Sequence, residues 1–92
     1  MEITLEENGT NGRYVHVFDD GSEAELNFQL RHNVMVINHV GVPTQHRNHG
    51  LAAKLVKKAI EDAKEKQLKV QPVCPYAAAQ FRRHPEWSDL LQ

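Results

Sequence analysis

The amino-acid sequence predicts an α+β fold, in which a mixed β-sheet is covered by helices. Three observations lead to this prediction. The first half of the chain alternates apolar and polar residues in short runs, separated by turn signals such as Asn8-Gly9 and Asp20-Gly21. A long apolar stripe at helical spacing follows over residues 50–66. One more extended run and a short helical segment come after it, so a strand–helix–strand crossover stands next to an antiparallel meander.

Composition limits the classes of function. With 92 residues, the chain is expected to form one domain over residues 1–92. The net charge of −1 argues against binding to nucleic acid or to an anionic membrane. Apolar runs are only a few residues long and the first residues are acidic, so neither a transmembrane helix nor a signal peptide is expected. Cys74 is the only cysteine, which excludes an internal disulfide and makes a cytoplasmic location the default.

The first three extended segments have different patterns. Residues 2–7 (EITLEE) alternate, residues 8–12 carry two Asn-Gly turn signals, and residues 13–18 (RYVHVF) are rich in aromatic and β-branched types. Residues 23–31 alternate strictly, with one apolar face and one polar face that carries Glu23 and Glu25. This pattern is typical of a half-buried antiparallel strand.

The remaining elements surround one strand that is expected to be central. Residues 34–42 (VMVINHVGV) are apolar on both faces, which predicts a strand covered on both sides. Gly41 within it indicates a bulge or the close approach of another group. After the helix at 50–66, residues 68–73 are expected to form a strand in which Pro72 favours an edge or splayed position. A short helix at 76–83 and a closing turn complete the predicted order, the turn containing Trp87, Leu90 and Leu91.

The turn before the long helix, 45-QHRNHGLA-52, has an unusual charge pattern. Helix starts favour acidic residues, yet this one carries His46, Arg47 and His49 and no carboxylate. Free backbone N–H groups at a helix N-terminus bind phosphate, and Gly50 and Asn48 suit a loop with left-handed torsions. The pattern therefore predicts an anion site, and the alternative is a polar loop with incidental histidines. It matches neither the Walker loop nor the dinucleotide fingerprint.

The sequence of this turn, together with the strand before it and the helix after it, resembles a motif of a known family. A strand ending in VGVP, followed by Q-x-x-x-x-G-L-A at the start of a long helix, resembles the acyl-coenzyme A motif of the Gcn5-related N-acetyltransferases. The family pattern is Gln/Arg-x-x-Gly-x-Gly/Ala; Gln45 and Gly50 match it, and Asn48 stands where the first glycine is usual. Further segments at 24–26, 39–43, 51–56 and 83–87, and the Pro-x-Cys-Pro-Tyr sequence at 72–76, resemble the very short, single-domain branch of this family.

The resemblance implies how coenzyme A would bind. The strand before the loop would splay from the strand after the helix, the pantetheine arm would lie against residues 39–42, and the pyrophosphate would bind the N–H groups of residues 46–51. Acetyl-coenzyme A is then the expected co-substrate. The residues expected to bind it are Val40, Gly41, Val42, Gln45, His46, Arg47, Asn48, His49, Gly50, Leu51 and Ala52.

N-acetyl transfer needs a free amine, stabilisation of an oxyanion and a proton for the leaving thiolate. The main chain around Val40 is expected to serve the oxyanion. His39 is a candidate base, with a buried, backbone-bonded histidine as the alternative. Cys74 is a candidate acetyl carrier or proton donor, with a small core residue as the alternative. Tyr76 is a candidate acid, with an aromatic packed under the last helix as the alternative.

Several other charged residues have plainer interpretations. Glu23 or Glu25 could receive the acceptor amine, although solvated strand carboxylates are the commoner outcome. A basic end of the short helix could reach a phosphate or simply complement the helix dipole, the residues concerned being Arg82, Arg83 and His84. The pair His46 and His49 lacks further ligands in the nearby sequence, so no metal is expected.

The sequence thus predicts an acetyl-coenzyme A-dependent N-acetyltransferase, with a non-catalytic or regulatory coenzyme A-binding module as the alternative. Larger relatives carry helices between the first two strands that help to build the acceptor site, and residues 8–12 leave no room for them. The acceptor is therefore expected to be a large or exposed amine such as a protein lysine, or a partner completes the site. The oligomeric state is left open.

Overall fold

The computed structural model describes residues 2–92, and its elements follow the predicted order. Met1, with which the predicted domain begins, lies outside the described residues. The α+β fold class is confirmed. The elements are β1 (Thr4–Asn8), β2 (Asn11–Val17), β3 (Glu23–Arg31), β4 (Val34–Gly41), the 3₁₀ helix η1 (Thr44–His46), α1 (Leu51–Glu65), β5 (Lys69–Pro72), α2 (Pro75–Arg83) and the 3₁₀ helix η2 (Pro85–Leu90).

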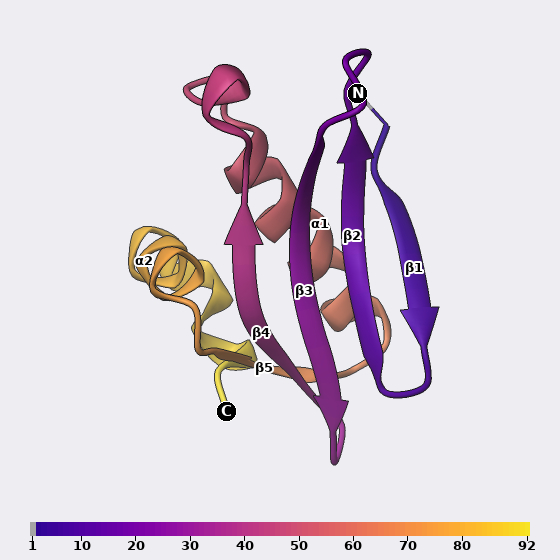
Figure 1. The fold of residues 1–92 in the computed structure, drawn as a ribbon. Helices are drawn as coiled ribbons and strands as arrows, with labels where there is room; N and C mark the ends of the chain where they lie inside the picture. The colour runs from indigo at the N-terminus through magenta and orange to yellow at the C-terminus, as the bar shows by residue number, and fades with distance from the viewer. Residues whose placement is uncertain (1) are drawn as a thin grey trace.

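The five strands form one mixed sheet in the order β1-β2-β3-β4-β5. The first four are antiparallel neighbours, and β5 is added parallel to β4 after the crossover through α1. Figure 1 shows α1 lying behind the sheet and α2 beside β4. Among the helices of residues 2–92, none is long and apolar enough to cross a membrane.

Strand β4 changes character halfway along. Residues 34–37 are all buried, as predicted for a central strand, but Asn38 and His39 are exposed. The register with β3 shifts between Asn27 and Phe28, because Asn27 pairs with His39 and Phe28 pairs with Ile37. Asn38 is therefore the extra residue of a β-bulge. Of the two expectations for Gly41, the bulge is at Asn38 instead. The close approach of another group is present, since a Cβ on Gly41 would lie 2.8 Å from His39 Nε2.

Pairing between β4 and β5 is short. It runs from Val34 opposite Lys69 to Ile37 opposite Pro72 and then stops. The N–H groups of Val73 and Cys74 both donate to the carbonyl of Ile37, at 3.1 and 3.0 Å. Because Pro72 has no N–H and α2 begins at Pro75, the chain turns away from β4 at this point. The splayed sheet that was expected is therefore present.

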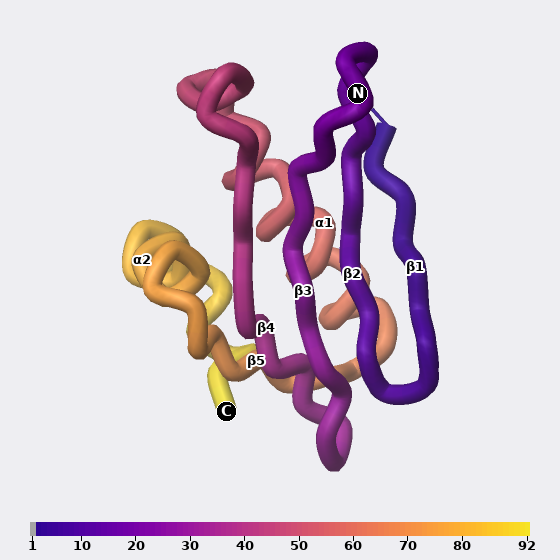
Figure 2. The backbone as a smooth tube through the Cα atoms, in the orientation of Figure 1, coloured from indigo at the N-terminus to yellow at the C-terminus, as the bar shows by residue number. Residues whose placement is uncertain are grey.

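Two loops lie at the same end of the sheet. The turn between β2 and β3 (residues 18–22) and the loop between β4 and α1 (residues 43–50) are both at the top of Figure 2. Although they are far apart in sequence, His46 of the second loop contacts Phe18 and Asp20 of the first.

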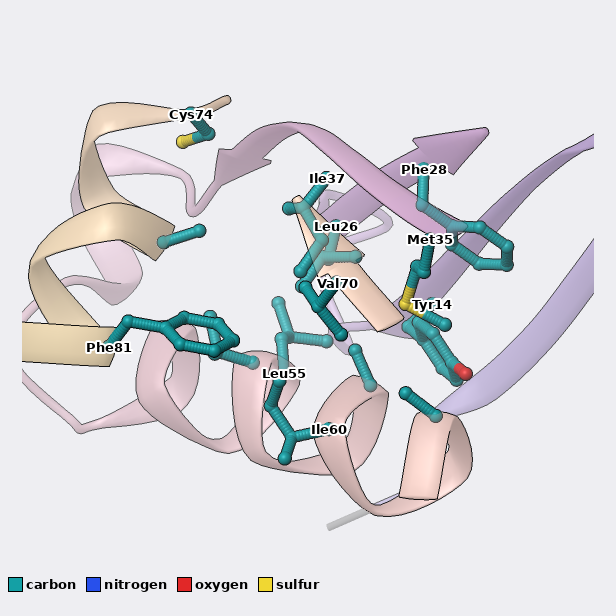
Figure 3. Packing of buried hydrophobic residues seen from close by; sticks show 14 of the residues in the cluster. Tyr14, Leu26, Phe28, Met35, Ile37, Leu55, Ile60, Val70, Cys74 and Phe81 are labelled. Atoms are coloured by element: carbon teal, nitrogen blue, oxygen red, sulfur yellow. The ribbon is translucent and has the colours of Figure 1, made fainter. Parts of the chain in front are cut away.

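The core lies between α1 and the sheet. Leu55 and Ile60 of α1 reach toward Leu26, Ile37 and Val70 of the strands, as Figure 3 shows. The buried residues of α1 recur at the spacing of the predicted stripe, and all are at most 5% exposed: Leu51, Leu55, Val56, Ala59, Ile60 and Ala63. Burial of this stripe fixes the start of α1 against the end of β4.

Tyr14 offers a test of this packing. Its side chain is fully buried, and its hydroxyl donates to Asp62 Oδ2 of α1 at 2.7 Å. Burial, followed by the bond to Asp62, raises the pKa of Tyr14 well above its usual range. Tyr14→Phe is expected to lower the free energy of unfolding by about 1–2 kcal/mol, because the bond is lost and the carboxylate of Asp62 is only partly exposed. Denaturant unfolding measures this change. An unchanged midpoint would show that the bond contributes nothing.

Candidate functional site

The splayed end of β4 forms one wall of a cleft of about 610 Å³. The loop after β4 and the first turn of α1 form a second wall, and Tyr76 of α2 forms a third. The predicted site residues that line it are His39, Val40, Gly41, Val42, His46, Arg47, Asn48, Gly50, Leu51, Ala52 and Tyr76. Gln45, His49 and Cys74 do not line it.

The loop over residues 43–50 presents unpaired backbone amides. Asn48 (φ 70°) and Gly50 (φ 72°) both adopt left-handed torsions, and Gly50 is the N-cap of α1. The first α1 hydrogen bond runs from Lys54 N–H to the Gly50 carbonyl at 3.1 Å. Within residues 2–92, no acceptor meets the N–H groups of residues 48–53. Such a set of amides at a helix N-terminus suits an anion.

The amide set differs from the predicted one, which began at residue 46. The N–H of His46 donates to the Pro43 carbonyl at 2.9 Å, and that of Arg47 donates to the Thr44 carbonyl at 3.3 Å. The 3₁₀ helix η1 therefore uses both groups internally. Residues 48–51 of the predicted set remain available, and two amides further along the helix join them.

The structure also indicates which register of the acyl-coenzyme A pattern fits this chain. With Gln45 in the first position, the pattern meets Asn48 where it has glycine. Started two residues later, Arg47-x-x-Gly50-x-Ala52 satisfies all three defined positions. These three residues line the cleft, whereas the side-chain amide of Gln45 lies 3.5 Å from Asp20 Oδ2. The later register was readable in the sequence and was missed.

His46 is held by the neighbouring turn. Its ring stacks on Phe18 with centroids 3.6 Å apart and planes 3° apart, and its Nε2 lies 2.9 Å from Asp20 Oδ2. Hydrogen bonds from Ser22, and then from His46, hold the pKa of Asp20 well below its usual range. Neither Phe18 nor Asp20 was predicted as a site residue, since only the fold brings residues 18–20 to this loop.

His39 and Tyr76 lie in the cleft as groups that could exchange protons. His39 is exposed rather than buried, and its ring covers Gly41: a Cβ on Gly41 would come within 2.8 Å of Nε2. The hydroxyl of Tyr76 accepts a hydrogen bond from Gln80 Nε2 at 3.2 Å. Partial burial raises the pKa of Tyr76 above the ordinary phenol value, although the residue is 36% exposed.

Cys74 lies behind the cleft rather than in it. It is 7% exposed, belongs to the core cluster and is the N-cap of α2 (Figure 3). Its N–H is bonded to the Ile37 carbonyl, which fixes it where β5 leaves β4. A catalytic role for Cys74 stays a prediction.

The remaining charged candidates lie outside the cleft. Arg13 binds three carboxylates on the open face of the sheet, those of Glu6, Glu23 and Glu25, at 2.7 to 3.0 Å. Glu23 and Glu25 are thus engaged in a surface ion-pair network. At the end of α2, His84 pairs with Glu86 at 2.9 Å. In the part of the chain that the structure describes, no three side chains of His, Cys, Asp or Glu gather as metal ligands.

Comparisons with known proteins agree with this architecture. A GCN5-like protein from Staphylococcus aureus, named as a candidate N-acetyltransferase and solved by NMR in solution, superposes with a TM-score of 0.77 at 25% sequence identity. The match covers 99% of this chain and 87% of that one. Residues 13–90 also match the family model of the GCN5-related N-acetyltransferases. Because that model spans most of the chain, this protein belongs to the GCN5-related N-acetyltransferase family.

Proposed function

We propose that this protein is an N-acetyltransferase that uses acetyl-coenzyme A as its co-substrate. The proposal is carried by one observation: a single cleft joins the unpaired amides that begin at Asn48, the splayed end of β4 and the side chain of Tyr76. The residues present suit coenzyme A. A Cβ on Gly50 would meet no protein atom within 4 Å, so the loop leaves room for a phosphate at its backbone.

In this proposal the loop and β4 divide the binding between them. The N–H groups of residues 48–53 and the side chain of Arg47 hold the diphosphate. The main chain of residues 39–42 bonds the pantetheine arm along the edge of β4 that faces away from β3, where the pairing with β5 has ended at Ile37. The thioester supplies an acetyl group that is activated toward attack by an amine.

The protein's own groups then handle charge and protons. His39 accepts a proton from the acceptor amine, for which its exposed position at the cleft is suited. The main chain at Val40 stabilises the negative charge that develops on the carbonyl oxygen. Tyr76 donates a proton to the departing thiolate, and its hydroxyl is free to do so because the bond from Gln80 occupies the oxygen and not the proton.

Direct transfer to the amine is the route that this arrangement favours. Tyr76 lines the cleft, whereas the thiol of Cys74 is buried and would have to turn out of the core to carry an acetyl group. β1 and β2 are joined by a tight turn at Gly9-Thr10 without an intervening helix, so the chain lacks the helices with which larger relatives help to build the acceptor site. We therefore propose a protein lysine or another exposed amine as the acceptor.

Intact-mass analysis distinguishes the two routes. After incubation with acetyl-coenzyme A alone, direct transfer predicts no acetyl group on Cys74, and Cys74→Ala should retain acetylation of an amine panel. A 42 Da adduct (about one acetyl group) that disappears in Cys74→Ala would establish the thioester route instead. Stabilisation by coenzyme A without acetylated product from any amine would identify a binding module and overturn the proposal.

A further inference from the structure

We propose that Asp20 and Phe18, in the turn between β2 and β3, are positioning residues for coenzyme A that act through His46. This inference rests on the proposed function. It assigns a role to a turn that contributes no residue to the wall of the cleft.

The contact between the turn and the loop has three parts. Phe18 covers one face of the His46 ring at 3.6 Å, and His16 meets Phe18 edge-on with centroids 4.7 Å apart. Asp20 Oδ2 bonds His46 Nε2 at 2.9 Å. Gln45 Nε2 reaches the same oxygen at 3.5 Å. The ring of His46 is thereby fixed on one face and at one edge.

Asp20 is itself fixed within its turn. Its other oxygen, Oδ1, accepts hydrogen bonds from Ser22 N at 2.9 Å and from Ser22 Oγ at 2.6 Å. The turn is closed by two backbone bonds of 2.9 Å between Phe18 and its neighbours Ser22 and Gly21. One carboxylate thus joins a closed turn to the loop that carries the unpaired amides.

The loop over residues 43–50 needs such support because few hydrogen bonds within it hold its backbone in place. Its internal backbone–backbone bonds are the two of η1, at His46 and Arg47, and Arg47 Nε also donates to the Val42 carbonyl at 3.2 Å. These bonds all precede Asn48 and Gly50, which adopt left-handed torsions. Fixing His46 fixes the C-terminal end of η1, and with it the point from which the amides of residues 48–53 start. His46 also lines the cleft, and its Nε2 is engaged by Asp20.

Removal of the Asp20 charge should change the affinity for coenzyme A in opposite directions, depending on whether Asp20 acts by charge repulsion or by positioning the loop. A carboxylate near a site for a diphosphate repels the ligand, so its removal should tighten binding on Coulomb grounds alone. If Asp20 positions the loop, its removal should weaken binding. Asp20→Asn is suited to this test, because the amide oxygen of asparagine still accepts the bonds from Ser22 while the charge facing His46 is removed.

The matched control is Asp19→Asn. Asp19 is exposed in the same turn, and no described residue forms a hydrogen bond or ion pair with its side chain. Isothermal titration with coenzyme A should give a Kd that is about threefold to fivefold higher for Asp20→Asn, the range expected for an exposed ion pair, and a Kd for Asp19→Asn at or slightly below the wild-type value. Phe18→Leu, which keeps apolar bulk but removes the stacking face, should also raise the Kd.

A double-mutant cycle and kinetics exclude a general structural effect. In a His46→Ala background, Asp20→Asn should no longer weaken binding, because only the charge effect remains. With an amine acceptor, KM for acetyl-coenzyme A should rise while kcat and the KM of the acceptor stay unchanged. A Kd for Asp20→Asn equal to or below that of Asp19→Asn would overturn the inference. Absence of any coenzyme A binding by the wild-type protein would overturn the proposed function as well.

Discussion

Gly50→Val is expected to abolish measurable coenzyme A binding while the protein remains folded. Gly50 is the N-cap of α1 at φ 72°, and its missing side chain points into open space beside the cleft. A valine side chain would occupy the place where a phosphate must approach the amides of residues 48–53. Losing even one or two charge-assisted bonds of this kind raises Kd by roughly a hundredfold. Isothermal titration with coenzyme A measures the loss.

Gly9→Val provides the matched control for strain. Gly9 has a φ of 63°, lies in the turn between β1 and β2, and likewise has no atom within 4 Å of an added Cβ. A β-branched residue with left-handed backbone torsions lowers the free energy of unfolding by about 1–2 kcal/mol at either position, so both variants should lose similar stability. Only Gly50→Val should lose coenzyme A. Equal affinity of the two variants for coenzyme A would show that the phosphate does not bind at this loop.

The elements of the fold were predictable because their patterns are local. Strict alternation over residues 23–31 gave β3 with its observed ends, and the apolar stripe gave α1 to within one residue at each end. Pro72 indicated the splay, since a residue without an N–H cannot extend a ladder. The bulge was misplaced because Gly41 and Asn38 both interrupt the apolar run, and only the pairing with β3 shows which of them is the extra residue.

The walls of the cleft were predictable from the loop and the strand before it, but their supports were not. Phe18 and Asp20 are separated from His46 by more than twenty residues, and nothing in their local pattern indicates a contact with the loop. The same limit applies to Cys74. Its position between two prolines was visible, whereas its burial against the core depends on how α2 packs.

Tyr76→Phe is expected to lower kcat on the order of a hundredfold with little change in the affinity for coenzyme A. In the proposed mechanism the phenol donates the proton that the thiolate needs, and loss of a general acid typically costs this much or more. Because burial raises the pKa of Tyr76, the hydroxyl stays protonated past the ordinary phenol value of about 10. The kcat of the wild-type enzyme should therefore show no alkaline decline below about pH 10.

Tyr14, the other tyrosine of the sequence, provides a control that distinguishes the loss of the general acid from the loss of any hydroxyl group. Tyr14 is also a tyrosine with a raised pKa, but its hydroxyl bonds Asp62 in the core and does not line the cleft. Tyr14→Phe should leave kcat near the wild-type value, whereas Tyr76→Phe should lower it, although both variants lose a hydrogen bond of the hydroxyl and with it some stability. If Tyr76→Phe retained full kcat, the thiolate would have to take its proton from another source. Cys74, the N-cap of the same helix, would then be the next group to test by substitution.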